Sequence, residues 1–232
     1  MSFVVLDANV ILLCRPQELA VSQLSELYQG ERAEILKFIP EGSRRILDIG
    51  CSTGDLGAAI KRGNKAIVTG IEINPDAARI AKEKLDAVFV GGVEDVISTQ
   101  DLGCFDAIIF ADVVEHLISP ADVIRACSRL LSPEGIAIFS IPNVRHISVL
   151  TELLFCNEWK YRESGILDRS HLRFFTDQSF ERLLRESGLV VRRKASTLSL
   201  RGSQFFDCIT CGFFRRFLAA QYIFVTARKV AA

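Results

Sequence analysis

Residues 46–60, ILDIGCSTGDLGAAI, decide the fold of this 232-residue chain. An apolar run that contains Asp48 leads to two glycines, Gly50 and Gly54, and then to a helical pattern that begins at about Asp55. Glycine adopts positive φ and lets a ligand approach the backbone closely, while the start of the helix presents unpaired N–H groups. The stretch therefore predicts a buried strand, a tight turn and a helix, with a ligand site between them.

Outside this stretch, short apolar runs alternate with helical patterns from residue 44 onward. Such alternation is typical of βαβ units and of a parallel sheet. Asn74 before Pro75, and Ser119 before Pro120, predict two capped helix starts, because proline at the first helical position gives up no needed hydrogen bond. Strands are expected at residues 45–49, 66–71, 87–90, 106–111, 136–141, 189–195 and 222–228.

Composition removes several classes of function. The formal net charge is zero and the basic residues are scattered, so the electrostatic footprint of a duplex-binding protein is missing and nucleic acid is not an expected partner. Seven dispersed cysteines, with no secretory signal before them, favour a reducing cytoplasm. The apolar residues 1–14 include Asp7 and fall short of the roughly 20 residues that span a bilayer, so no membrane anchor is expected.

Two local patterns raise alternatives that the rest of the sequence does not support. Cys208 and Cys211 form a C-x-x-C without a second pair or a nearby histidine, which favours packed thiols over zinc, and no metal site is expected. Residues 3–12, FVVLDANVIL, resemble the opening strand of PIN-type nucleases, but matching carboxylates elsewhere are not identified. A plain strand or packing arm is favoured there.

The identity of the ligand follows from glycine spacing and from acids. In a nicotinamide-dependent dehydrogenase the pattern G-x-G-x-x-G would place glycines at positions 52 and 55, which are Ser52 and Asp55. A buried carboxylate at position 48 favours a cationic or donor-rich ligand rather than a pyrophosphate. Glu72 follows the second predicted strand, where an acid can accept both hydroxyls of a ribose. Glu94 or Asp95 is expected to hold an adenine edge.

Five motifs occur in order over residues 44–143: ILDIGCSTG, IEINP, GGVEDV, FDAIIFADVVEHLISP and LLSPEGIAIFSIPN. Together they resemble the motifs of class I S-adenosylmethionine-dependent methyltransferases. The resemblance implies an α/β fold with a Rossmann-like, doubly wound seven-stranded sheet, mostly parallel with the last strand antiparallel. It implies S-adenosylmethionine as cofactor. It implies cofactor contacts at Asp48, Gly50, Cys51, Ser52, Gly54, Glu72, Ile73, Glu94, Asp95, Ala111 and Asp112, with Ser52 replacing the more common glycine.

The residues after the fourth strand bear on the acceptor. Asp112-x-x-Glu115-His116 resembles small-molecule methyltransferases rather than enzymes with N-P-P-Y, which methylate amines of bases or amides. Methyl transfer to oxygen usually needs a base, and the three histidines of the chain are the candidates near neutral pH. His116 is one candidate for the base, and packing or capping at a helix start is its alternative role.

Residues 142–175 form an insertion that resembles the acceptor-side segment of methyltransferases from cell-surface polysaccharide pathways, which implies a sugar hydroxyl as acceptor. Asp168, His171 and Arg173 gather polar groups in an aromatic stretch. We expect His171 to act as base or to position the hydroxyl, and Asp168 and Arg173 to bind the acceptor. A structural network that fixes the loop to the sheet is the alternative.

The chain is expected to form one domain, because no linker-like run interrupts it. Residues 1–43 are interpreted as an arm and a helix, 44–141 as the cofactor-binding core, 142–175 as the insertion, and 176–232 as a C-terminal helix and strands. In the last part Thr176 is expected to cap a helix that Gly188 ends. The Phe-rich residues 205–218 fit a packed helix, a lid, a dimer contact or a membrane-facing patch.

Two other functions stay open from sequence. A protein that binds S-adenosylmethionine without catalysis would keep the first-strand site and lack turnover. A nicotinamide-dependent dehydrogenase is disfavoured by Ser52 and Asp55. A homodimer is possible, and a small molecule, such as a saccharide, is the expected partner.

Overall fold

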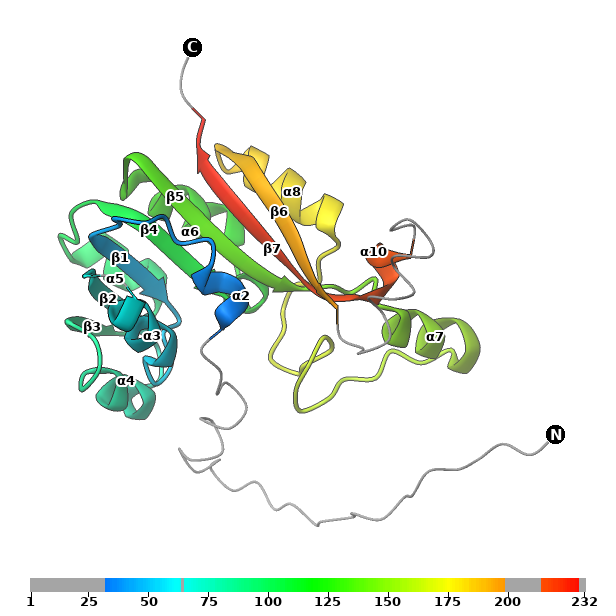
Figure 1. Ribbon diagram of the computed structural model, residues 1–232. Coiled ribbons are helices and arrows are strands. Elements are labelled where there is room, and N and C mark those ends of the chain that lie inside the picture. Colours follow the sequence, from blue (N-terminus) through cyan, green and yellow to red (C-terminus); the bar gives the residue numbers. More distant parts are fainter. Residues whose placement is uncertain (1–31, 64, 199–213, 230–232) are drawn as a thin grey trace.

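The structure is a computed structural model that describes residues 32–63, 65–198 and 214–229, in which helices cover both faces of one sheet (Figure 1). The strands are β1 (Arg45–Ile49), β2 (Ile67–Glu72), β3 (Ala87–Val90), β4 (Phe105–Ala111), β5 (Leu131–Pro142), β6 (Leu189–Leu198) and β7 (Ala219–Arg228). The helices are α2 (Ala33–Leu36), α3 (Asp55–Gly63), α4 (Pro75–Ala81), α5 (Val93–Thr99), the 3-10 turn η1 (Val114–His116), α6 (Pro120–Arg129), α7 (Ile147–Cys156), α8 (Asp177–Glu186) and α10 (Arg215–Leu218).

The sheet has the order β3-β2-β1-β4-β5-β7-β6. β1 pairs in parallel with both β2 and β4, and β7 runs antiparallel to its neighbours β5 and β6. The chain thus builds outward from β1 to β3 and then returns to β4, which makes the gap between the ends of β1 and β4 the switch point of the topology. Ligands of open α/β sheets bind at the carboxyl ends of the strands at that point. The predicted seven-stranded fold with a reversed last strand is confirmed.

Two hydrophobic cores, one on each face, hold the helices to the sheet. Successive strand residues point to opposite faces, so Leu47 packs in one core and Ile46 in the other. The first core receives side chains from α5, α6 and α8, including the fully buried Phe180, and the second receives Ile35 of α2 and Ile60 of α3. Burial on both faces explains why these strands read as continuous apolar runs rather than as alternating patterns.

Most predicted helix boundaries are confirmed by capping contacts. Asn74 Oδ1 accepts the N–H groups of the first turn of α4, and Thr176 forms a capping box with Ser179 at the start of α8. Gly188 ends α8 at φ 84°. The prediction for Ser119 was wrong in part. α6 begins at Pro120 as expected, but the Ser119 side chain makes no capping hydrogen bond.

The insertion contains an element that the sequence did not predict, the helix α7. After α7 the chain returns as an irregular segment that reaches the sheet again at the Asn143–Phe175 bridge. On the way, the N–H groups of Leu172 and Arg173 donate to the carbonyl oxygen of Glu115 at 2.8 and 3.0 Å. These two bonds fix the segment to η1, which directly follows β4.

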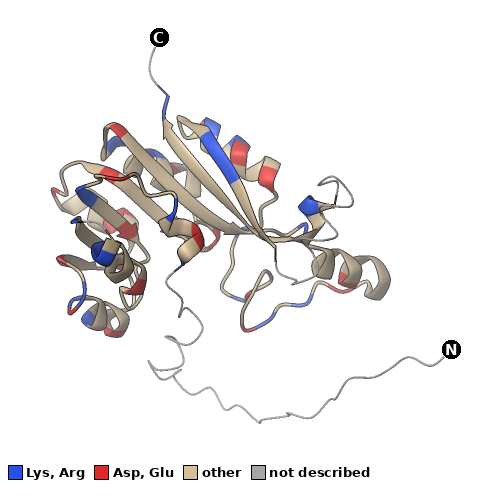
Figure 2. Cartoon of the chain, viewed as in Figure 1, with Lys and Arg blue, Asp and Glu red and all other residues tan. Residues whose placement is uncertain are grey.

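Several sequence features lie outside the described residues: residues 3–12, Cys208 and Cys211, and positions 205–213 of the Phe-rich segment. Within the described part, Phe214 is 40% exposed and precedes α10. No helix there is long and apolar enough to cross a membrane. Basic and acidic positions are interspersed along the described ribbon, in keeping with the zero net charge (Figure 2).

Candidate functional site

Two cavities open at the carboxyl ends of the strands. The first, here called the turn cavity, has a volume of about 350 Å³ and lies at the switch point between β1 and β4. Apart from Arg32, which precedes α2, its walls come from the ends of three strands and from the segments that follow them. They are Arg32, Asp48, Gly50, Cys51, Ser52, Thr53, Asp55, Leu56, Glu72, Ile73, Asn74, Ala77, Ala111, Asp112, Val113 and His116.

The turn after β1 has the backbone shape that its glycines predict. Gly50 has φ 67°, and a Cβ atom there would lie 2.6 Å from Cγ2 of Val113, so the close approach of the neighbouring wall requires glycine. Ser52 also adopts a left-handed conformation, with φ 49°. A non-glycine residue in that region costs on the order of 1 kcal/mol or more, which explains why glycine suits position 52.

Glu72 fixes this turn from the end of β2. Its Oε2 accepts the N–H of Ser52 and its Oε1 accepts the N–H of Asn74, both at 2.8 Å. The side chain is buried but lines the turn cavity. Each carboxylate oxygen has a second lone pair, so Glu72 can still accept hydroxyl groups of a ligand. Glu72 therefore has a structural role that the sequence did not predict, in addition to the ligand-binding role that the sequence predicted.

Two buried atoms of opposite charge in the same cavity have no partner among the described residues. Oδ2 of Asp48 accepts no hydrogen bond, and Nη1 of Arg32 donates none. Burial raises the pKa of the Asp48 carboxyl to about 7, while the charge of Arg32 lowers it and that of Glu72 raises it. A buried polar atom without a hydrogen-bond partner is costly, so this pair of atoms predicts a ligand that carries both an ammonium and a carboxylate. The amino-acid end of S-adenosylmethionine carries both.

Asp112 joins the turn cavity to the rest of the site. It has φ 55°, and its carboxylate accepts from Nη2 of Arg32 at 2.7 Å and from Nε2 of Gln221 at 3.0 Å. Burial by itself would lower the pKa of Arg32, but the Asp112 carboxylate raises it above its ordinary value. Asp112 thus ties α2 and β7 to the end of β4.

The second cavity, here called the insertion cavity, has a volume of about 460 Å³ and shares Arg32, Asp112 and His116 with the turn cavity. Most of the remaining lining residues have polar side chains, and they come from α2, η1, the insertion and the start of β7. They are Glu34, Glu115, Pro142, Glu163, Ser164, Gly165, Ile166, Asp168, His171, Ala220 and Gln221.

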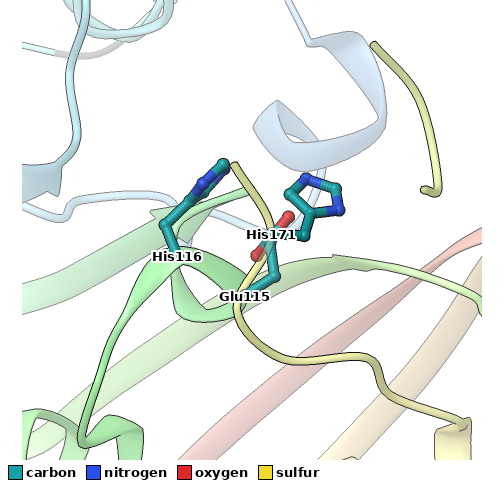
Figure 3. Close-up of side chains that lie close together, drawn as sticks. All are labelled: Glu115, His116 and His171. Carbon is teal, nitrogen blue, oxygen red and sulfur yellow. The ribbon is translucent and has the colours of Figure 1, made fainter. Parts of the chain in front are cut away.

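Glu115, His116 and His171 meet where the two cavities join (Figure 3). The two imidazole rings lie edge to face with centroids 4.8 Å apart. Burial lowers the pKa of His171 below its usual value, so its ring is neutral at neutral pH. Glu115 is 1% exposed, and burial raises the pKa of its carboxyl well above the usual value, with the charge of Asp112 adding to the effect.

The residues predicted from sequence fall into three groups. Asp48, Gly50, Cys51, Ser52, Glu72, Ile73, Ala111 and Asp112 line the turn cavity. Asp168 and His171 line the insertion cavity, and His116 lines both. Gly54, Glu94, Asp95 and Arg173 line neither of the two cavities.

The residues outside the cavities have other contacts. Gly54 has φ 79°, and a Cβ there would lie 3.1 Å from the Ala81 backbone, so this glycine serves turn packing. Glu94 and Asp95 belong to the first turn of α5. Nη2 of Arg173 donates to the Ile118 carbonyl at 2.9 Å, which holds the insertion against the segment after η1. This contact fits the structural network named above as the alternative for the insertion.

Three residues of the site were missed from sequence: Arg32, Glu115 and Gln221. The motif Asp112-x-x-Glu115-His116 contains Glu115, and its position next to His116 in that motif was the available signal. Arg32 precedes β1 in the arm, and Gln221 lies in the last strand. No motif marks either one, because only the folded chain brings them to Asp112.

Comparison with known proteins gives a family match and curated relatives. A family model described as "Methyltransferase domain" matches residues 21–194. Ubiquinone biosynthesis O-methyltransferase of Neisseria meningitidis is 29% identical over 159 residues, which are 64% of this chain and 64% of that protein. The protein of the same name from Thiobacillus denitrificans is 30% identical over 156 residues, 65% of this chain and 66% of that one. The chain thus spans just under two thirds of the length of these relatives.

Solved structures share the fold at lower sequence identity. A SAM-dependent methyltransferase from Archaeoglobus fulgidus superposes with a TM-score of 0.67 at 16% identity, covering 88% of this chain and 97% of that one. A possible histamine N-methyltransferase from Thermotoga maritima gives a TM-score of 0.61 at 18% identity, covering 89% of each chain. At such identities the likeness concerns the arrangement of strands and helices.

Proposed function

This chain belongs to the methyltransferase-domain family, and from that premise we propose that it transfers the methyl group of S-adenosylmethionine to a hydroxyl of a small acceptor. The single observation that carries the proposal is the junction of the two cavities at Arg32, Asp112 and His116. A donor in one cavity and an acceptor in the other would meet there. Methyl transfer is an in-line displacement, so it needs this kind of alignment more than it needs many catalytic groups.

The turn cavity fits the cofactor that the family implies. Asp48 would receive the ammonium group, and Arg32 the carboxylate, because each has a buried atom without a partner in the described chain. Glu72 would accept the ribose hydroxyls from the end of β2. When bound, S-adenosylmethionine supplies an electrophilic methyl group. The protein's part is to orient that group and to keep water away from it.

The insertion cavity favours an acceptor with several hydroxyl groups. Five carboxylates, two imidazoles, one guanidinium and one amide line it, so its walls offer many hydrogen-bonding groups to an acceptor. A saccharide matches such walls better than a long apolar molecule. A phenol is the second candidate, because the relatives are named ubiquinone biosynthesis O-methyltransferases and because His171 packs against Phe174, which neighbours Trp159.

Activation of the acceptor hydroxyl is assigned to the group formed by Glu115, His116 and His171. His171 faces the insertion cavity as a neutral imidazole, and a neutral imidazole has a lone pair for a proton or an electrophile. Asp168 lies on the same wall and positions the hydroxyl or its neighbours. The sequence prediction that Arg173 binds the acceptor has no support from this cavity, since its guanidinium donates to the Ile118 carbonyl instead.

The test is methyl transfer by the full chain to two acceptor panels, nucleotide sugars and substituted phenols. S-adenosylhomocysteine affinity is measured by calorimetry in parallel. We expect binding of S-adenosylhomocysteine and a gain of one methyl on a sugar hydroxyl, read by mass spectrometry. Methylation of phenols alone would move the acceptor to the second candidate. Tight binding of a nicotinamide dinucleotide without any response to S-adenosylhomocysteine would contradict the proposal as a whole.

A further inference from the structure

The junction of the two cavities contains a group of side chains with the composition of a metal site. Glu115, His116 and His171 each offer one ligand atom, and these atoms lie within 4.8 Å of one another. Figure 3 shows the Glu115 carboxylate between the two rings, although the residues come from η1 and from the far end of the insertion. Two imidazoles with one carboxylate form a common ligand set for divalent transition metals and zinc.

The second ring nitrogen of each histidine supports this interpretation. Nδ1 of His116 lies 3.2 Å from the Ser170 carbonyl oxygen, and Nδ1 of His171 lies 3.0 Å from that of Ile166. A carbonyl oxygen only accepts, so Nδ1 carries the proton in both contacts and Nε2 keeps the lone pair. Metal-ligating histidines are typically oriented in this way, by a backbone carbonyl on the opposite nitrogen.

An independent observation concerns Glu115. Its side chain is 1% exposed, and neither carboxylate oxygen has a hydrogen-bond partner among the described residues. The carbonyl of the same residue is occupied by the N–H groups of Leu172 and Arg173, so the backbone is fixed while the side chain is unsatisfied. Burying the ionised carboxylate without a donor is costly, and no Lys or Arg of the described chain is within ion-pair distance of it, so a cation held between it and the two imidazoles would offset that cost.

We propose that Glu115, His116 and His171 bind one divalent cation of the zinc type, where the two cavities join. Coordination bonds of about 2 Å would draw the three ligand atoms to within roughly 3–3.5 Å of one another, a small movement of side chains. Imidazole nitrogen selects zinc, cobalt or nickel over magnesium and calcium, which prefer oxygen ligands. The sequence prediction that the chain has no metal site is replaced by this proposal.

The role of the cation rests on the proposed function. Three protein ligands leave at least one coordination position, which faces the insertion cavity that Glu115, His116 and His171 all line. An acceptor hydroxyl bound there has a lowered pKa and loses its proton to solvent. Its oxygen then forms the bond to the methyl carbon, and the C–S bond of the sulfonium breaks with the electron pair left on sulfur. One proton is released for each methyl group transferred.

The experiment measures Zn²⁺ and Co²⁺ binding to the chelator-treated full chain, without cofactor or acceptor. The background is the double variant Cys208→Ser, Cys211→Ser, which removes the C-x-x-C as a competing site. We expect one ion per chain and a Co²⁺ spectrum without thiolate charge-transfer bands. Removing a residue that only hydrogen-bonds to a metal ligand already weakens metal binding about 10-fold to 100-fold. Glu115→Gln and His171→Ala should therefore each weaken Zn²⁺ binding by at least about 100-fold.

The matched control is His146→Asn, the third histidine of the chain, whose side chain caps α7 and lies outside the group. Asparagine keeps a capping oxygen, and Zn²⁺ affinity should stay as in the background protein. Thermal unfolding checks that each variant folds. If His171→Ala does not fold, the test of the site rests on the isosteric variant Glu115→Gln. Absence of binding, or equal affinity in Glu115→Gln and His146→Asn, overturns the site.

Methyl transfer is assayed separately with chelator-treated and zinc-loaded protein. Because Zn²⁺ affinity is measured without cofactor or acceptor, failure of the proposed function would leave the binding result intact. Full methyl transfer by metal-free protein overturns the role given to the cation while the proposed function stands.

Discussion

The walls of the two cavities are assembled in different ways. Apart from Arg32, the turn cavity is built from the ends of β1, β2 and β4 and from the residues that directly follow them. The insertion cavity gathers α2, η1, residues 163–171 and the first residues of β7, which are far apart in the chain. A site that is built on the ends of neighbouring strands can be predicted from local sequence motifs. A site built from distant segments depends on contacts that only the folded chain makes.

The two regions also differ in what holds their polar groups. In the turn cavity Glu72 accepts two backbone N–H groups, so the turn and its carboxylate support each other. In the insertion cavity the backbone of Glu115 is held by Leu172 and Arg173, while its carboxylate has no partner in the described chain. We therefore expect substitutions in the turn cavity to change cofactor affinity, and substitutions in the insertion cavity to change turnover.

The largest effect is expected for His171→Ala. The side chain lines the insertion cavity and not the turn cavity, so S-adenosylhomocysteine affinity should stay close to that of the wild type. Methyl transfer should fall about 100-fold to 10,000-fold, because activation of the hydroxyl acts only in the transition state. Single-turnover rates and calorimetry measure the two quantities. His116→Ala is the competing variant, and near wild-type turnover in His171→Ala would transfer the assignment to His116.

The next effect concerns Glu72→Ala in the turn cavity. We expect cofactor affinity to fall by about 1–3 kcal/mol, or about 5-fold to 150-fold, the range for lost charge-assisted hydrogen bonds. The melting temperature should fall as well, because the N–H groups of Ser52 and Asn74 lose their acceptor. Glu72→Gln is the control, since its one remaining oxygen can serve only one of these donors. An unchanged affinity per folded molecule would restrict Glu72 to the structural role.

The same contrast explains how much the sequence predicted. Each of the seven expected strands is present, and the central strands β1, β2 and β4 are recognisable because burial on both faces produces apolar runs that need no knowledge of the partner strand. Eight of the expected cofactor residues line the turn cavity because the glycines and acids follow strand ends in a fixed order. Arg32 and Gln221 were not predicted. They reach Asp112 through tertiary contacts that no spacing in the chain records.

A pH experiment on the cofactor side follows from Asp48. Burial raises its pKa to about 7 in the fold, against about 4 for an exposed aspartate, so the folded chain holds one extra proton between these values. Stability without ligand should therefore fall as pH rises from about 4 to 7, by up to about 1.4 kcal/mol per pH unit. An ammonium beside Asp48 favours the ionised form. S-adenosylhomocysteine affinity should thus rise up to about 10-fold per pH unit below pH 7 and level off above it.

The control for this prediction is Asp48→Asn, in which the affinity should be weaker and its pH dependence flat below pH 7. Arg32 and Glu72 are the charged groups that face Asp48, and the Asp48→Asn substitution leaves both of them in place. Calorimetry in buffers of different ionisation enthalpy should register proton release on binding at pH 6. The same pH profile in Asp48→Asn and in the wild type would show that another group is responsible.

The smallest effect is a difference between two glycines, one in the wall of each cavity. Gly50 and Gly165 both have positive φ, at 67° and 95°. A Cβ on Gly50 would lie 2.6 Å from Val113 Cγ2, whereas a Cβ on Gly165 would meet no atom of the described residues within 4 Å. Gly165→Ala should cost only the backbone strain, about 1–2 kcal/mol of the free energy of unfolding. Gly50→Ala adds displacement of Val113 and should cost about 1 kcal/mol more. Urea unfolding of both variants measures the difference, and S-adenosylhomocysteine affinity should fall only in Gly50→Ala, because Val113 lines the turn cavity. Equal stability of the two variants would mean that the wall of the turn cavity accommodates a Cβ as easily as the loop around Gly165 does. The proposed difference in packing between the turn cavity and the insertion cavity would then be wrong.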